Sequence, residues 1–459
     1  KYSIIIPYRN REEHLRTLLP RLQQKFEGKD YEIIVAEQMD EGPFCKTILM
    51  NVAIKYATGD IFVFQDVDYY PTDNVLYDYD EDVAIYPVRN VIFLDAVGQE
   101  MDSNKIPAGY KFFKYDVGDH TGGVVIVSRA NFIKVNGFNP SYRGWGKEDD
   151  DFHMRFDYHN VPRRRNGNGA FLALHHADSA PPQNDPNFMH NVSLMNQFLD
   201  TYWLGYSHAS ADVNEFELEG IPNGRWLKMT NLKVTTKLVS ICLTTRHRVE
   251  SLKRTVQAIV DTVKNPSNVE IVFKVDADDP ETIEYVKNLN IGIDVLYSIS
   301  PRHPLGYYGV AQYDTEVSRI ARGKLCIIFA DDIVCQTPGW DELLIPYQDI
   351  YGVIHAIDDD AGEVKTAWYN SAKLFRTMQW FGTHPHMDRW MNQLWSALPE
   401  ISVGSVTSKT SHTRDNLPDP TEPERPHIFP MLGGPQLEEW SQIYERVKKH
   451  LIMIGKRQP

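Results

Sequence analysis

The stretch Ile61–Asp68, which reads IFVFQDVD, decides the fold that the sequence predicts. It opens with a short run of β-branched and aromatic residues, which is typical of a strand buried on both faces of a parallel sheet. Asp66 and Asp68 come directly after this run, where the strand is expected to end. Because ligands of parallel α/β sheets bind beyond the carboxyl ends of the strands, two carboxylates stand where a ligand is expected.

Strands and helices are expected to alternate before this stretch as well, which indicates a mostly parallel sheet. Strands are predicted over residues 3–7 and 32–36. An amphipathic helix is predicted to open at about residue 8 and to run to about residue 26. A second helix is predicted over residues 44–57.

The same order of elements begins again near residue 238, so we expect a divergent internal repeat of one α/β unit. The run VSICLTTRHR, residues 239–248, repeats the opening strand and its arginine-rich turn, and a helix is predicted over residues 249–263. Strands predicted over residues 269–275 and 324–329 each end in aspartates. The fold class is therefore α/β, with two tandem domains that have mostly parallel central sheets.

The two domains are predicted over residues 1–232 and 233–459. A linker is expected around residues 210–237, where Asn223-Gly224 breaks the periodicity. Residues 414–435 are rich in proline and are expected to form an irregular surface segment. A closing helix is predicted from residue 436 to about residue 452.

The composition, with 42% hydrophobic and 24% charged residues, suits globular domains with apolar cores. The net charge of -14 indicates no broad basic surface for nucleic acid, although it is compatible with a local basic groove. No apolar run approaches the roughly 18 residues that a membrane helix needs. The first residue is Lys1 and no signal-peptide pattern follows it, so a native N-terminal segment with a targeting signal stays open.

The chain has four cysteines, Cys45, Cys242, Cys326 and Cys335, and their spacing is not that of a zinc site. Cys242 and Cys326 lie in apolar runs that are predicted to be strands. We therefore expect buried free thiols in a reducing compartment, and the expected location is the cytoplasm.

A second informative stretch is Gly144–Asp151, which reads GWGKEDDD. Neighbouring like charges raise the proton affinity of each carboxylate, which suits a general base. The glycines allow a mobile backbone, and Trp145 offers a flat apolar face. The alternative interpretation is an acidic helix N-terminus, where carboxylates favour the positive end of the helix dipole.

Asp66 and Asp68 are two residues apart, so they project to one side of an extended backbone. Hard cations such as Mg²⁺ and Mn²⁺ prefer these oxygens and bridge a diphosphate. If His175 or His176 also binds the cation, the imidazole would favour Mn²⁺ over Mg²⁺. The alternative is that the two histidines are ordinary surface residues. The alternative is that the two aspartates are ordinary loop residues.

Arg9 and Arg11 follow the first predicted strand and are candidates to hold phosphates or the edge of a nucleotide. Two arginines near the start of a helix are otherwise ordinary surface residues.

Residues 1–190 resemble the β-1,4-galactosyltransferase family, whose members have the GT-A fold and use UDP-sugars with Mn²⁺. The matching stretches, in the family's order, are PYRNR (residues 7–11), FVFQDVD (62–68), GGV (122–124) and GWGKEDDD (144–151). The resemblance implies that the nucleotide sugar is bound by Pro7, Tyr8, Arg9, Arg11, Asp66, Gly123 and Trp145, with Trp145 on a closing loop. It further implies that Asp68 and His175 bind the metal, that Asp149 is the base, and that Glu148 holds the acceptor.

The sequence departs from this family at three places. Leu172 stands where the family often has a methionine ligand, so His176 or water would have to complete the metal site. His120-Thr121 stand where aromatics usually flank the donor sugar, which leaves galactose as donor open. The disulfides of the secreted animal members cannot form, which favours an intracellular microbial or viral origin.

Residues 239–415 resemble the family-2-like glycosyltransferases, which also have the GT-A fold. The matching stretches are TTR (244–246), VDADDP (275–280), SPR (300–302), ADD (330–332), PGWD (338–341) and MDRW (387–390). The resemblance implies nucleotide-sugar contacts from Thr245, Arg246, Asp276, Arg302 and Asp331. It implies that Asp332 and His412 bind metal and that Asp388 is the base; lone histidines and paired aspartates in loops are the alternative.

The expected activity is therefore that of a metal-dependent inverting glycosyltransferase, with two active sites, that transfers sugars from UDP-sugars to a hydroxyl of a glycan or glycoconjugate. Two alternatives stay open. One is sugar transfer to hydroxymethylated bases of phage DNA, which the acidic pI disfavours. The other is one catalytic domain beside a binding domain that positions the acceptor.

Overall fold

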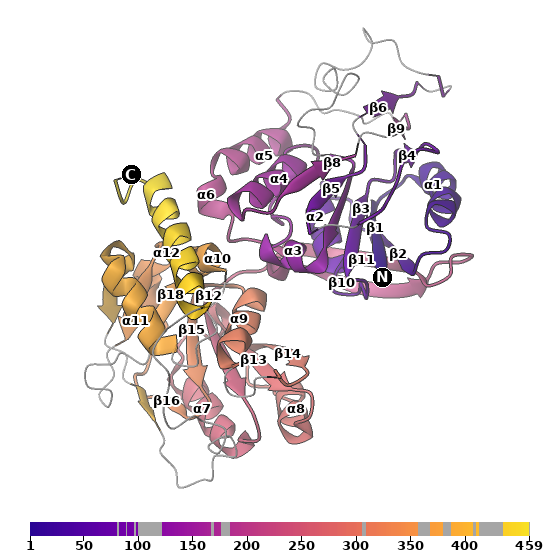
Figure 1. Ribbon diagram of the computed structural model, residues 1–459. Helices are drawn as coiled ribbons and strands as arrows, with labels where there is room; N and C mark the ends of the chain where they lie inside the picture. The colour runs from indigo at the N-terminus through magenta and orange to yellow at the C-terminus, as the bar shows by residue number, and fades with distance from the viewer. Residues whose placement is uncertain are drawn as a thin grey trace. The chain divides into compact units, whose positions relative to one another are not determined.

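The computed structural model describes residues 1–79, 82–88, 90–95, 98–99, 122–166, 169–175, 184–304, 309–356, 368–379, 387–406, 410–412 and 435–458. The chain divides into two compact units, Lys1–Thr235 and Thr236–Pro459, which we refer to as the first and second unit (Figure 1). Each unit is built around one sheet whose central strands are parallel. The predicted fold class is confirmed.

The first unit has an eight-stranded sheet with the order β10-β11-β2-β1-β3-β7-β5-β8. Its strands are β1 (Tyr2–Tyr8), β2 (Tyr31–Gln38), β3 (Ile61–Gln65), β5 (Ala84–Tyr86), β7 (Val124–Ser128), β8 (Arg163–Arg165), β10 (Ala209–Glu217) and β11 (Gly224–Val234). A separate three-stranded sheet contains β4 (Tyr69–Pro71), β9 (Ala170–Ala173) and β6 (Asn90–Phe93). The helices are α1 (Glu12–Lys25), α2 (Lys46–Ala53), α3 (Arg129–Lys134), α4 (Glu148–Tyr158), α5 (Pro186–Asn196) and α6 (Phe198–Thr201).

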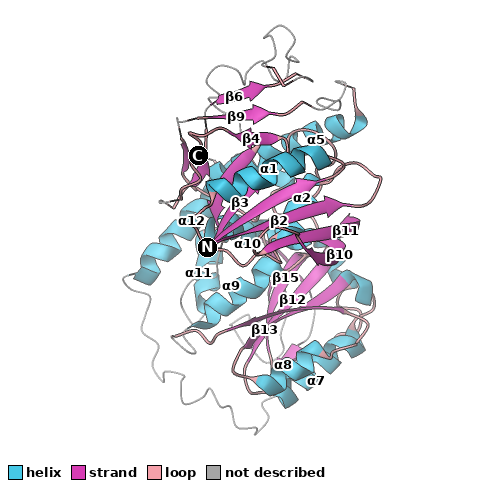
Figure 2. Ribbon diagram, turned by 90° about the vertical axis from the view of Figure 1, so that its right-hand side faces the viewer, coloured by secondary structure: helices cyan, strands magenta, loops and turns pink. Residues whose placement is uncertain are grey.

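The isoleucine run of β1 explains why this sheet is covered on both faces. Successive side chains of a strand point to opposite faces. Ile4 and Ile6 pack with the leucines of α1, whereas Ile5 packs in a second apolar cluster with the residues of α2. Figure 2 shows both helices beside the central strands. Full burial of each such side chain contributes roughly 1.5–3 kcal/mol.

The second unit has a seven-stranded sheet with the order β14-β13-β12-β15-β18-β17-β19. Its strands are β12 (Lys237–Thr245), β13 (Val269–Asp276), β14 (Asp294–Ser300), β15 (Gly323–Ala330), β17 (Val353–Ala356), β18 (Trp368–Ser371) and β19 (Ser402–Val406). Two further strands, β16 (Ile333–Cys335) and β20 (Thr410–His412), pair with each other. The helices are α7 (Val249–Thr262), α8 (Pro280–Lys287), α9 (Val310–Ile320), α10 (Ala372–Met378), α11 (Met387–Ala397) and α12 (Pro435–Met453).

The two sheets repeat one topology, as the sequence predicts. The order β2-β1-β3-β7-β5-β8 in the first unit corresponds to β13-β12-β15-β18-β17-β19 in the second. Corresponding strand pairs have the same parallel or antiparallel sense. A buried polar pair is repeated as well, because Ser3 donates to Glu32 over 2.6 Å and Ser240 donates to Glu270 over 2.5 Å.

The division between the two units follows Thr235, inside the range 210–237 predicted for the linker, but most of that range is not a linker. Residues 209–234 instead form the antiparallel hairpin β10–β11, and β11 pairs in parallel with β2 of the first unit. Asn223-Gly224 lies where the hairpin returns, with Asn223 at φ +56°. The hairpin strands are largely polar because much of β10 is exposed, so their hydrophobic pattern is weak. The predicted boundary between residues 232 and 233 falls inside β11.

Other expectations concern the ends of the chain and the cysteines. The closing helix is confirmed as α12, whereas the proline-rich residues 414–434 lie outside the described residues. All four cysteines are free, and three of them are buried, as expected. Within the ranges that the structure describes, no helix combines the length and the apolar character needed to cross a bilayer.

Asp314 on α9 provides a test of stability against pH. Its side chain is buried, and burial raises the carboxyl pKa from 3.8 to about 8, although Thr244 donates a hydrogen bond that lowers it. The folded state therefore holds a proton that the unfolded chain releases above pH 4, so the free energy of unfolding should fall as pH rises from 4 to 8. In the wild-type protein the free energy of unfolding should fall by a value on the order of 5 kcal/mol over this interval. In Asp314→Asn this fall should be absent.

The measurement is urea unfolding at pH 5 and pH 8. Asp261→Asn, at an exposed position on α7, is the control and should follow the wild-type protein. Equal pH dependence for the wild-type protein and Asp314→Asn would contradict the buried protonated carboxyl.

Candidate active site

Asp66 and Asp68 lie where the sequence predicts them, directly beyond β3 at the carboxyl end of the parallel strands. The backbone N–H of Asp66 donates to the carbonyl of Gly123 over 2.8 Å. Gly123 has φ +88°, and a Cβ at this position would lie 2.3 Å from the ring of Tyr69, so only glycine fits. The expected neighbours Asp66 and Gly123 are therefore in contact through the backbone.

The Gly-Trp-Gly turn before α4 depends on left-handed backbone at Gly144, Gly146 and Lys147, with φ of +64°, +96° and +76°. Asn191 of α5 holds the turn, because its amide donates to the carbonyl of Gly146 over 2.8 Å. Trp145 is 40% exposed, and its ring centroid lies 5.7 Å from that of Phe188 on α5. The tryptophan therefore sits on an exposed turn that one helix supports.

Lys46, which the sequence analysis did not single out, connects the two acidic stretches. Its Nζ lies 3.0 Å from Asp66 Oδ1, 3.3 Å from Glu148 Oε1 and 3.3 Å from Asp149 Oδ1. All four side chains are mostly buried, with exposures of 11–26%. One ammonium group thus joins the end of β3 to the first turn of α4.

Lys46 is the first residue of α2, and every later residue of that helix is buried. Burying an ammonium group is costly unless it is paired. A lysine at the start of an otherwise fully buried helix is therefore the sequence signal that could have identified Lys46.

The carboxylates around Lys46 have raised proton affinity. Burial raises the pKa of Asp149 well above its usual range, Glu148 and Asp66 raise it further by repulsion, and Lys46 opposes the rise. Burial likewise raises the pKa of Asp66 to about 6, again against the effect of Lys46. A carboxylate whose proton affinity is raised by its surroundings can act as a general base.

The remaining acids of this run, Asp150 and Asp151, pair with residues close by in the sequence. For these two residues the interpretation as an acidic helix N-terminus holds. Asp151 is fully buried and pairs with Arg155 over 2.6 Å. Asp150 pairs with Lys147 over 2.9 Å at a more exposed position. Only Glu148 and Asp149 contact Lys46.

The turn after β1 carries the predicted nucleotide-binding residues. Pro7 lies in β1, and Tyr8 ends the strand, is buried, and packs edge-to-face on Trp226. Arg9 donates to the carbonyl of Gly42 over 2.6 Å, and Arg11 stands at the N-cap of α1.

Asp68 and His175 are joined through the backbone of two paired strands. Tyr69 of β4 lies opposite Ala173 of β9, and the N–H of Leu174 donates to the carbonyl of Asp68 over 2.8 Å. His175 follows directly and is exposed. A carboxylate and an imidazole together form a donor set that fits Mn²⁺. No cluster of three or more acidic, histidine or cysteine ligands occurs in the described part of the chain, and His176 lies outside it.

A small pocket opens beside this site. Gly122, Tyr69 and Arg165 are among the residues that line it. His120 and Thr121 lie outside the described residues.

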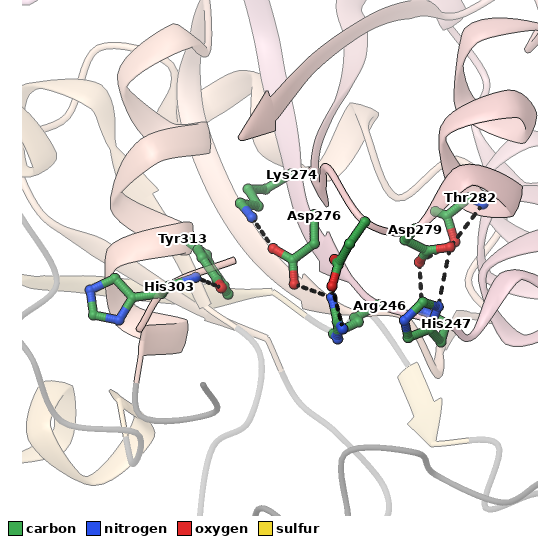
Figure 3. A network of polar contacts seen from close by, with 9 residues as sticks. Arg246, His247, Lys274, Asp276, Asp279, Thr282, His303 and Tyr313 are labelled. Carbon is green, nitrogen blue, oxygen red and sulfur yellow. Dashed lines mark hydrogen bonds and ion pairs between the residues drawn. The ribbon is translucent and has the colours of Figure 1, made fainter. Parts of the chain in front are cut away.

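In the second unit, the acids at the end of β13 are paired with cations (Figure 3). Arg246 donates to Asp276 Oδ2 over 2.8 Å, and Lys274 pairs with the other oxygen of Asp276. Lys274 also lies 3.8 Å from the ring centroid of Tyr313. The sequence analysis missed Lys274, although a lysine in the fully buried strand β13 is itself an unusual signal.

The acids at the end of β15 are paired as well. Arg248 donates to Asp331 Oδ1 over 2.6 Å and to Asp332 Oδ2 over 3.3 Å. Thr245 donates its hydroxyl to Asp331 Oδ2 over 2.8 Å. The sequence analysis predicted Thr245, Asp331 and Asp332 here but not Arg248.

The other predicted residues of the second unit are placed mainly by the backbone. Asp388 is the second residue of α11, as Asp149 is the second residue of α4. His412 lies opposite Ile333 in the β16–β20 pair. Arg302 follows β14 and is half-buried.

Two family models match the chain, and both match residues of the first unit. The model described as the N-terminal region of glycosyl transferase group 7 matches residues 1–79. The model described as the N-terminal domain of galactosyltransferase matches residues 107–177.

Curated relatives include β-1,4-galactosyltransferase 4 of Mus musculus, which is 34% identical over 167 residues, 35% of this chain and 44% of the relative. A β-N-acetyl-D-glucosaminide β-1,4-N-acetylglucosaminyl-transferase of Lymnaea stagnalis is 34% identical over 189 residues, 39% of this chain and 35% of the relative. The chain thus spans less than half the length of these relatives.

Among solved structures, the catalytic domain of Drosophila β1,4-galactosyltransferase 7 in complex with xylobiose has 21% identity and a TM-score of 0.40, covering 51% of this chain and 94% of that chain. A mutant of the same enzyme, in complex with manganese, UDP-Gal and xylobiose, has 22% identity and a TM-score of 0.39, with the same coverage.

The first unit is an α/β domain with an acidic site at the ends of its parallel strands. Its sequence is similar to galactosyltransferases of glycosyl transferase group 7, so the resemblance predicted for residues 1–190 is confirmed.

Proposed function

We propose that the first unit is a metal-dependent inverting glycosyltransferase that transfers a sugar from a UDP-sugar to the hydroxyl group of a carbohydrate acceptor. The observation that carries the proposal is the contact of Lys46 with both Asp66 and Asp149. This contact brings the strand end that would hold the donor next to the helix that would hold the acceptor. The relatives' names, and the manganese, UDP-Gal and xylobiose of one solved structure, support the same class of donor, metal and acceptor.

In this proposal Asp149 removes the proton of the acceptor hydroxyl, and Glu148 orients that acceptor. The hydroxyl oxygen attacks the anomeric carbon from the face opposite the diphosphate, so the configuration inverts. Asp68 and His175 would hold Mn²⁺, which when bound neutralises negative charge on the departing diphosphate. Trp145 on its supported turn would cover the bound donor and exclude water.

The second unit is proposed to be a second transferase site, which would make the protein bifunctional. Its support is the repeated topology, in which Asp388 holds the same place on α11 that Asp149 holds on α4. A binding domain without catalysis is the alternative for this unit. Cytoplasmic location stays a prediction, supported by the four free cysteines.

The test is incubation of the protein with a panel of nucleotide sugars and acceptors, followed by measurement of the released diphosphate with Mn²⁺ and with EDTA. We expect acceptor-dependent release of UDP that requires Mn²⁺. Asp68→Ala should weaken Mn²⁺-dependent UDP binding at the first unit at least tenfold, because it removes a charged metal ligand. Unchanged Mn²⁺-dependent binding in Asp68→Ala would count against this metal site.

The same panel should include DNA with hydroxymethylated bases. Transfer to this DNA and to no carbohydrate would replace the glycan acceptor with nucleic acid. If Asp388→Asn leaves every transfer intact, the binding-domain alternative for the second unit is preferred.

A further inference from the structure

The acidic residues at the ends of β3 and β15 can be compared position by position. The turns after β1 and β12 align Asn10 with His247, both with φ of +52°. The pairing of β1 with β3 and of β12 with β15 then makes Asp332 the equivalent of Asp68. If the second unit bound metal as the first is proposed to do, Asp332 would be its ligand.

The second unit differs from the first at the preceding position, where Asp331 replaces Val67. Both oxygens of Asp331 already accept hydrogen bonds, one from Arg248 and one from Thr245. Because Asp331 is only 6% exposed, it fixes the guanidinium firmly, and the other arm of Arg248 reaches Asp332. A guanidinium thus bridges Asp331 and Asp332, the carboxylate that a divalent cation would need.

The histidine predicted to help bind metal in the second unit is also displaced. His412 lies opposite Ile333, which makes it the equivalent of Ala173, because Ala173 lies opposite Tyr69 in the first unit. His175, the proposed metal ligand, lies two residues further along the chain. The backbone register therefore does not repeat the pairing of Asp68 with His175.

We propose that the second unit binds a nucleoside diphosphate without a divalent cation, with the Arg248 guanidinium in the place of the metal. The proposal rests on the proposed function of the second unit as a nucleotide-sugar site. The residues do not fit a metal, because a cation entering between Asp331 and Asp332 would meet a fixed positive charge. Guanidinium groups bind phosphate oxygens through paired N–H donors, so Arg248 supplies the charge that a metal supplies elsewhere.

Two further cations lie at the neighbouring strand end, where each is paired with an acid and Arg246 is paired with both Asp276 and Asp278. Arg246 and Lys274 hold Asp276 from opposite sides at the end of β13, the strand next to β12 (Figure 3). Ligands of parallel sheets enter at this edge. A diphosphate there would have arginines from the turn after β12 on one side and a nucleoside contact from Asp276 on the other.

The experiment uses the full chain carrying Asp68→Ala, which removes the proposed metal ligand of the first unit. Binding of UDP, GDP, CDP, ADP and dTDP is measured in turn by titration calorimetry, in EDTA and in Mn²⁺. We expect at least one of these nucleotides to bind in EDTA, with an affinity that Mn²⁺ changes less than threefold. Electron paramagnetic resonance should detect no Mn²⁺ bound to this variant in the presence of that nucleotide.

Arg248→Ala, made in the same background, should reverse this behaviour. The metal-free affinity should fall at least tenfold, and Mn²⁺ should restore part of it, because Asp331 and Asp332 are then open to a cation. Arg248→Lys should keep part of the metal-free binding, since it keeps the charge. Arg254→Ala, at an exposed position on α7, is the matched control and should leave binding unchanged.

The outcomes separate this inference from the proposed function. Nucleotide binding that appears only with Mn²⁺ overturns the inference but leaves a second transferase site in place. No binding of any of the five nucleotides in either buffer overturns both. Metal-free binding that Arg248→Ala does not weaken also overturns the inference.

Discussion

Asp149→Asn should lower kcat by about 10³-fold, within the range that removal of a general base usually produces. Asparagine has nearly the same size and can still accept a hydrogen bond from Lys46, but it cannot take a proton from an acceptor hydroxyl. Binding of UDP in the presence of Mn²⁺ should change less than threefold, because the proposed function places Asp149 on the acceptor side of the site. Steady-state kinetics with the best donor and acceptor of the panel, together with UDP titration, measure both quantities.

Asp150→Asn is the control for this variant. Asp150 is the next residue of α4, pairs with Lys147 and is 41% exposed, so its removal should cost little activity. If Asp149→Asn keeps more than a tenth of the wild-type kcat, Asp149 is not the base.

Lys46→Met should lower activity at pH 7 at least 10²-fold and shift the acidic limb of the pH profile of kcat/KM to higher pH. Lys46 lowers the pKa of Asp149 and of Asp66 against the effect of burial. Without the ammonium group both pKa values rise further, so less of the ionised base is present at any given pH. The limb should move by one pH unit or more, and the profile of kcat/KM reports it because it follows the free enzyme.

Lys46→Arg keeps the charge and is the control for Lys46→Met. It should retain the position of the acidic limb even if its larger group lowers the rate. The midpoint of thermal unfolding of each variant shows that the fold is kept. A pH profile of Lys46→Met that coincides with that of the wild-type protein would contradict the role of Lys46.

The sheet and the ends of its strands could be predicted from the sequence because their signals are local. The run Ile61–Asp68 reads as a buried strand by composition alone, and the carboxyl end of a parallel strand is where ligands bind. The run Gly144–Asp151 is likewise visible as a turn followed by acids. The structure brings these two stretches together, as the family resemblance implied.

The cations that organise both sites could not be predicted in the same way. Lys46 and Lys274 belong to no motif, and Arg248, although it ends the arginine-rich turn of residues 239–248, was assigned no role. Their roles arise from pairing with acids that are distant in sequence, such as Asp149, which lies on another helix. The hairpin over residues 209–234 was missed for a related reason, because a largely exposed edge has little hydrophobic periodicity.

We propose that Asp68 and His175 hold a divalent cation in the first unit. Crystals grown with Mn²⁺ and UDP, and measured at the manganese absorption edge, test it most directly. We expect a strong anomalous peak within bonding distance of Asp68 and His175, and none between Asp331 and Asp332. A map with no peak at Asp68 would contradict it.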